Sequence, residues 1–166
     1  MEHMNSKAFE LAESSGRQKA LLALNKVDIF HGDFSDYRVI PTEGKYCKWD
    51  FEVRDNLTNE LLAIVEAKDR KMPSTDKKLK YGGAQLEAQK LDFLKNKAED
   101  EDIVALYLCT YTDDKFYIWN VTECDGITED KRMCNKTTAV LSEKIEKHCY
   151  YFPMNNAEFI GDLFTL

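Results

Sequence analysis

The stretch that most constrains the fold runs from residue 46 to residue 68 and reads as two strands joined by a turn. Residues 46–54 alternate apolar with charged side chains, which is typical of a strand with one buried face. Residues 55–59 are rich in Asp and Asn, which favour turns because they tolerate unusual backbone angles. The run from Leu61 to Val65 is wholly apolar and indicates a strand buried on both faces. We therefore expect a β-hairpin at the centre of the molecule, with its second strand covered on both sides.

The buried strand ends in an acid and a base, Glu66 and Lys68, which are separated by one residue. Side chains two apart on a strand point to the same face. Burying either charge is costly unless it is paired or holds a metal ion. This strand end is therefore a candidate functional site.

The register of the hairpin decides which residue faces this strand end. If Arg54 pairs with one of residues 60–61, Asp50 lies opposite one of residues 64–65, one step or a diagonal from Glu66. We therefore expect the Asp50 carboxylate to converge with the acid and the base at one end of the hairpin.

Two neighbouring carboxylates repel each other unless a cation lies between them, and Mg²⁺ takes oxygen ligands of this kind. Asp50 followed by Glu66-Ala67-Lys68 on the next strand resembles the PD-(D/E)XK nuclease superfamily. The resemblance implies an Mg²⁺ or Mn²⁺ ion on Asp50, Glu66 and the main-chain carbonyl of Ala67. It also implies hydrolysis of phosphodiester bonds by a metal-activated water, assisted by Lys68, with a 5′-phosphate product. The alternative for the same residues is a surface salt bridge at a strand end.

A helix is expected over residues 6–25, because Ser6 can cap it and apolar residues recur at helical spacing. Glu10 and Glu13 lie in its first half. In the superfamily that the chain resembles, a glutamate of the first helix often completes the metal site. The sequence does not choose between the two, and either fits equally well as a solvated helix residue.

Basic residues are concentrated directly after the candidate site. Residues 68–80 hold six basic and two acidic side chains. Such a run is usually a solvated loop, but its position beside the acids also suits contacts to a nucleic-acid backbone. Arg70, Lys71 and Lys80 are the expected contacts.

A second helix is expected over Tyr81–Lys97, with two glycines at its start. Gln85 and Gln89 lie one turn apart on this helix and are within reach of the candidate site. Gln85 is the further candidate for a nucleic-acid contact, and ordinary solvent-facing glutamines are the alternative for both.

The remaining elements place the hairpin in a mixed fold. Further strands are expected at Tyr37–Ile40, Val104–Tyr111 and Lys115–Val121, and Trp119 is expected in the core rather than stacked on a base. The order over residues 6–122 matches the αβββαβ core of the superfamily with one strand added. This implies an α/β (α+β mixed), restriction-endonuclease-like fold, with a central mixed sheet flanked by helices.

Residues 123–166 are expected to extend this single domain of 166 residues. The pattern suggests a short helix at Ala139–Lys147, a strand at Tyr150–Pro153 and a last helix at Asn155–Phe164. This tail loosely resembles small nuclease-like proteins of phages and bacterial mobile elements.

Charge and composition narrow the functional classes. The net charge of −7 argues against indiscriminate binding to polyanions, so any nucleic-acid contact must be local. Five cysteines without regular spacing favour thiols in a reducing cytoplasm. No apolar run approaches the roughly 20 residues of a membrane span, so no membrane partner is expected.

The sequence thus predicts an Mg²⁺- or Mn²⁺-dependent nuclease, a hydrolase with DNA as the expected substrate. A homodimer is compatible with the superfamily resemblance. The alternatives are a catalytically silent nucleic-acid-binding module on the same fold, or a phage protein that inhibits a host factor through its acidic surface.

Overall fold

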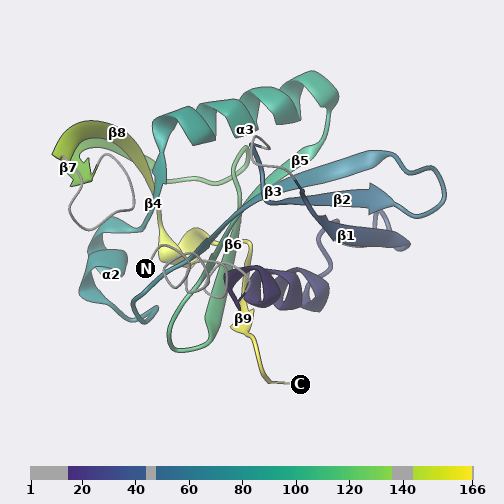
Figure 1. Ribbon diagram of the computed structural model, residues 1–166, viewed down its shortest axis with the longest axis horizontal. Helices are drawn as coiled ribbons and strands as arrows, with labels where there is room; N and C mark the ends of the chain where they lie inside the picture. The colour runs from purple at the N-terminus through teal and green to yellow at the C-terminus, as the bar shows by residue number, and fades with distance from the viewer. Residues whose placement is uncertain (1–14, 44–47, 136–143, 166) are drawn as a thin grey trace, which may run out of the picture.

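The computed structural model describes residues 15–43, 48–135 and 144–165 (Figure 1). Its main element is a six-stranded mixed sheet of order β1-β2-β3-β5-β6-β9. Strands β3 and β5 run parallel, and the other described neighbours in this sheet are antiparallel. The strands are β1 (Tyr37–Pro41), β2 (Phe51–Asp55), β3 (Leu61–Asp69), β5 (Val104–Thr110), β6 (Lys115–Asn120) and β9 (Phe159–Asp162).

Helices cover both faces of this sheet. The N-terminal helix, residues 15–26 and purple in Figure 1, lies on one face, and α3 (Ala88–Glu101) lies on the other. Leu24 packs in one core with the side chains of the first face, and Leu91 packs with Trp119 in the other. The expected mixed α/β architecture with flanking helices is therefore confirmed, and Trp119 is a core residue.

The central hairpin forms as expected, with one irregularity in its register. Arg54 pairs with Leu61, and a bulge then shifts the pairing so that Phe51 lies opposite Val65. Asp50 directly precedes β2, and its amide donates to the carbonyl of Val65, one of the two residues expected opposite it. The Ala67 amide donates to the Asp50 carboxylate, so the Asp50 side chain lies at the strand end that carries Glu66.

The expected helix over Tyr81–Lys97 is also wrong, because the segment is divided into three elements. It contains the end of α2 (Lys77–Gly82), then β4 (Ala84–Glu87), then most of α3. Gly83 separates them with φ of 84°, and a Cβ there would lie 2.4 Å from the Phe152 carbonyl oxygen. Gly83 therefore ends one helix and lets a strand approach its neighbour.

The C-terminal region is built mainly from strands rather than from the expected helical tail. A second sheet of order β4-β8-β7 contains β7 (Thr128–Asn135) and β8 (Lys144–Phe152). The expected strand at Tyr150–Pro153 forms the end of β8. The expected helix at Ala139–Lys147 lies partly outside the described residues, and its described end belongs to β8.

The last expected helix, Asn155–Phe164, is replaced by a 3₁₀ turn, η1 (Met154–Asn156), and by β9. Strand β9 pairs with β6 at the edge of the main sheet. A Cβ at Gly161 would lie 2.6 Å from the Phe116 ring, so the glycine permits this close pairing. Among the described helices, none has the length and apolar character needed to cross a membrane.

Candidate active site

Strand β3 presents Glu66 and Lys68 to the face covered by α3. Glu66 is buried, with 4% of its surface exposed. Lys90 of α3 lies 2.8 Å from Glu66 Oε1, and the Lys68 ammonium lies 3.8 Å from the same oxygen. Two lysines from different elements therefore converge on one buried carboxylate.

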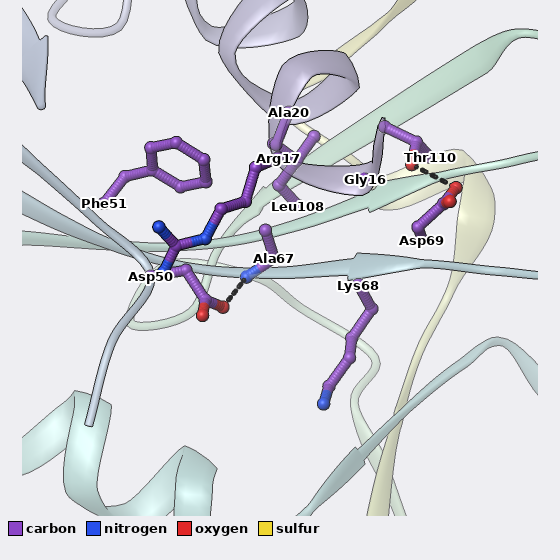
Figure 2. A pocket seen from close by; sticks show the side chains of 10 residues that line it. All are labelled: Gly16, Arg17, Ala20, Asp50, Phe51, Ala67, Lys68, Asp69, Leu108 and Thr110. Atoms are coloured by element: carbon purple, nitrogen blue, oxygen red, sulfur yellow. Dashed lines mark hydrogen bonds between the residues drawn. The ribbon is translucent and has the colours of Figure 1, made fainter. Parts of the chain in front are cut away.

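Asp50 is held at the same strand end by the main chain of β3. The Ala67 amide donates to Asp50 Oδ2 at 2.8 Å, and the Asp50 amide donates to the Val65 carbonyl at 2.8 Å. Figure 2 shows the Asp50 carboxylate and the Lys68 side chain on one side of β3, with Asp69 on the other. The three predicted residues Asp50, Glu66 and Lys68 thus lie together.

These side chains line a cavity of about 370 Å³ between β3 and α3, the β3–α3 cavity. Its lining consists of two carboxylates, three lysines, a glutamine, an aromatic ring and the strand backbone. These residues are Lys48, Asp50, Glu66, Ala67, Lys68, Gln89, Lys90 and Phe93.

A smaller cavity of about 160 Å³ shares Asp50, Ala67 and Lys68 with it, and extends toward the N-terminal helix at Arg17 (Figure 2). Asp50 therefore contributes to the lining of cavities next to both covering layers.

The ionisation of the site reflects burial first and neighbouring charges second. Burial, followed by the Asp50 charge, raises the pKa of Glu66, and the Lys90 charge opposes this. Burial and the Lys90 charge lower the pKa of Lys68. For Lys90, burial acts against the ammonium, but the Glu66 charge and hydrogen bond outweigh it and raise the pKa. A second cation beside Glu66 therefore already offsets part of the cost of its buried charge.

The donor atoms at this site fit a hard divalent cation. Within the described residues, no group of three or more His, Cys, Asp or Glu side chains is placed to hold a metal. The implied set is instead two carboxylates, Asp50 and Glu66, and a main-chain carbonyl. The amide and carbonyl of one strand residue point to the same edge, so the Ala67 carbonyl is directed toward the side where its amide meets Asp50. All of these donors are oxygens, as Mg²⁺ prefers. Glu10 and Glu13 lie outside the described residues.

The expected nucleic-acid contacts are scattered. Arg70 points inward, where its Nη2 donates to the Gln85 carbonyl at 2.5 Å and to the Tyr107 hydroxyl at 2.6 Å. The Tyr107 hydroxyl is the main cause of a raised pKa for Arg70. Lys71 has 80% of its side chain exposed and lies 3.7 Å from Asp69. The Arg70 guanidinium is thus used within the fold, whereas Lys71 faces solvent.

Two further predicted contacts also lie away from the β3–α3 cavity. Lys80 is exposed at the end of α2, 5.7 Å from the ring centre of Tyr81. Gln85 belongs to β4 instead of a helix, and its Nε2 donates to Cys149 Sγ at 3.0 Å. Only the other glutamine, Gln89, lines the cavity.

Sequence reasoning missed Lys90, although a signal was present. Lys90 lies one helical turn before the buried Leu94, so it belongs to the stripe of α3 that faces the sheet. A lysine on a buried stripe requires an acidic partner. The preceding buried acid in the chain is Glu66, and the structure joins the two.

Comparison of the sequence with protein-family models found no match, and comparison with curated proteins found none either. The geometry of the β3–α3 cavity is therefore the feature that indicates a function for this chain.

Proposed function

We propose that this chain is a metal-dependent nuclease of the PD-(D/E)XK type, which hydrolyses phosphodiester bonds in nucleic acid, with DNA as the expected substrate. The observation that carries the proposal is the meeting of Asp50, Glu66 and Lys68 in one cavity at the ends of two adjacent strands. Buried charges are paired with an opposite charge or coordinate a metal ion, and carboxylate oxygens are ligands that Mg²⁺ prefers.

Each residue has a defined role in this proposal. Asp50, Glu66 and the Ala67 carbonyl would hold Mg²⁺ or Mn²⁺, which when bound polarises a phosphate and makes a bound water more acidic. The Lys68 side chain is 38% exposed and lines the cavity, and its ammonium would orient the attacking water or stabilise charge on the phosphate oxygens. The Asp50–Ala67 hydrogen bond fixes the first carboxylate before substrate arrives.

The order of elements supports the same proposal. The N-terminal helix, the strands β1, β2 and β3, the helix α3 and the strand β5 follow the αβββαβ order, with α2 and β4 inserted. A Cβ on Gly16 would lie 3.2 Å from Asp69 of β3, so the N-terminal helix approaches the strand that carries the site. Glu10 or Glu13, which lie outside the described residues, is proposed as the additional metal ligand.

The proposed contacts to the nucleic-acid backbone are revised by the fold. Lys71 and Lys80 are exposed and keep this role, and Lys48 at the cavity joins them. Arg70 and Gln85 are dropped, because their polar groups bond within the protein.

The experiment is a cleavage assay with linear, branched and single-stranded DNA and with RNA, in Mg²⁺ or Mn²⁺. Asp50→Asn is expected to lose cleavage by a factor of about 100 or more, because the metal loses a charged ligand. Glu60→Gln is the matched control, since Glu60 is an exposed acid in the hairpin turn outside the cavity. Wild-type protein that leaves every substrate intact in both metals would exclude the nuclease.

One observation favours a second candidate, a nucleic-acid-binding module that does not cut. The Lys90–Glu66 ion pair at 2.8 Å partners the buried acid without any metal. Such a module would still slow the migration of DNA in a gel-shift assay when a chelator is present. It would leave the DNA uncleaved when metal is added.

A further inference from the structure

The β3–α3 cavity already contains a cation beside its most buried acid. The Lys90 ammonium lies 2.8 Å from Glu66 Oε1, whereas the Lys68 ammonium lies 3.8 Å from it. Lys90 approaches from α3 on a flexible side chain that is 39% exposed, so it can leave without any change in the strand. Its ammonium therefore lies against the carboxylate that the proposed metal would use.

The charge balance of the cavity determines what happens when a metal ion enters it. Its lining carries two acids, Asp50 and Glu66, and three lysines, Lys48, Lys68 and Lys90. A divalent cation added to this set would leave a large excess of positive charge in a partly buried space. An arriving phosphate group would remove that excess, because it carries negative charge and offers oxygens to the lysines.

We propose that Lys90 is an internal counter-ion of Glu66, which the metal displaces when nucleic acid binds, and that the released ammonium then contacts a phosphate oxygen. This inference rests on the proposed function and adds a regulatory step to it. The metal and the nucleic acid must then bind together, each increasing the affinity for the other by the same factor. Lys90 acts as a phosphate-binding and positioning residue in this scheme, and Lys68 remains next to the reacting group.

The proposal predicts that removing Lys90 increases the affinity of the site for the metal ion. In Lys90→Met, Glu66 has lost its closest competing cation, so Mn²⁺ alone should bind about tenfold more tightly than to wild type. Wild type should reach similar Mn²⁺ affinity only when nucleic acid is present. In the variant, the gain in Mn²⁺ affinity on adding nucleic acid should fall to less than about threefold.

The test measures free Mn²⁺ by electron paramagnetic resonance, with and without a phosphorothioate oligonucleotide, offered single-stranded and as a duplex. Lys95→Met is the matched control, because it removes one exposed lysine from the same helix outside the cavity. The control should show the wild-type metal affinity and the wild-type gain on adding oligonucleotide.

Thermal unfolding of the variants, with and without Mn²⁺, shows whether a changed metal affinity comes from a folding defect. Lys90→Met should unfold at a lower temperature without metal, because a buried acid has lost its closest partner, and Mn²⁺ should raise that temperature more than in wild type. Lys90→Gln keeps a hydrogen-bond donor without the charge, so it serves for the affinity measurement should the methionine variant not fold.

The outcomes separate this inference from the proposed function. Metal binding by wild type that is unchanged in Lys90→Met and Lys90→Gln overturns the role of Lys90 and leaves the nuclease proposal standing. Absence of Mn²⁺ binding by every variant, with and without oligonucleotide, overturns both.

Discussion

At the scale of single residues, the site depends on which cations neutralise the buried carboxylate of Glu66. Glu66 Oε1 has Lys90 at 2.8 Å and Lys68 at 3.8 Å, so the two lysines contribute unequally to holding the charge. The closer one offsets the cost of burial, which leaves the more distant one available to a ligand in the β3–α3 cavity. This division of roles can be tested by removing the two lysines separately.

Lys68→Met is expected to keep the fold and to lose cleavage by a factor of about 100 to 1,000, as when one group that stabilises transition-state charge is removed. The fold should persist because Glu66 retains Lys90 and the Lys68 side chain lies at a strand end. Single-turnover cleavage and thermal unfolding measure the two effects, with Lys95→Met as control. Loss of folding in Lys68→Met would make Lys68 a structural lysine instead.

His31 supports a pH prediction away from the site. Its Nε2 lies 2.6 Å from Glu158 Oε1, and this hydrogen bond is the main cause of a raised pKa for His31. Because the folded pKa lies above the unfolded value of 6.5, the stabilisation is complete below that pH and is lost as pH rises through the folded pKa.

The unfolding temperature of wild type should therefore exceed that of His31→Gln by more at pH 5.5 than at pH 8.5. Glu158→Gln should show the same trend, since it removes the other partner. A difference that stays constant between the two pH values would contradict the role of this pair.

At the scale of elements, the break between α2 and β4 depends on a single glycine. Gly83→Ala places a Cβ 2.4 Å from the Phe152 carbonyl oxygen at a φ of 84°, so it should destabilise the protein by about 2 kcal/mol or more. The neighbouring Gly82→Ala is the matched control, because its Cβ would meet nothing within 4 Å. Urea unfolding compares the two, and equal stability would mean that β4 does not depend on this approach to β8.

The elements also show what the sequence could predict. The alternation around Phe51 and Val53 and the apolar run of β3 were recognisable because burial on one or both faces is recorded in neighbouring residues. The bulge after Val53 was not, because a register shift depends on pairing across the hairpin and leaves the apolar pattern unchanged.

The C-terminal helix prediction was wrong for a related reason. Short segments such as Phe159–Asp162 suit a helix or a strand equally by pattern, and pairing with β6, far back in the chain, decides for a strand. Lys90 was missed because its partner is 24 positions away on another element. Contacts that are distant in sequence are thus the part that local patterns did not reveal.

At the scale of the whole molecule, an acidic protein carries a locally cationic cavity. The net charge is −7, yet three lysines and two acids line the space between β3 and α3. The positive charge is local because the end of β3 lies beneath α3, and α3 contributes Lys90 to the same space. Binding of nucleic acid should therefore be local, and its affinity should fall only gently with salt, because few lysines contact phosphates and few counterions are released.

The central claim is that Asp50 and Glu66 share one cation, and the most direct measurement is anomalous diffraction from a crystal soaked in Mn²⁺ together with a phosphorothioate oligonucleotide. The account predicts a single strong peak at about 2.1 Å from an oxygen of each carboxylate and near the Ala67 carbonyl, with Lys90 moved off Glu66. A crystal that binds the oligonucleotide but shows no peak there, with Lys90 still on Glu66, would contradict it.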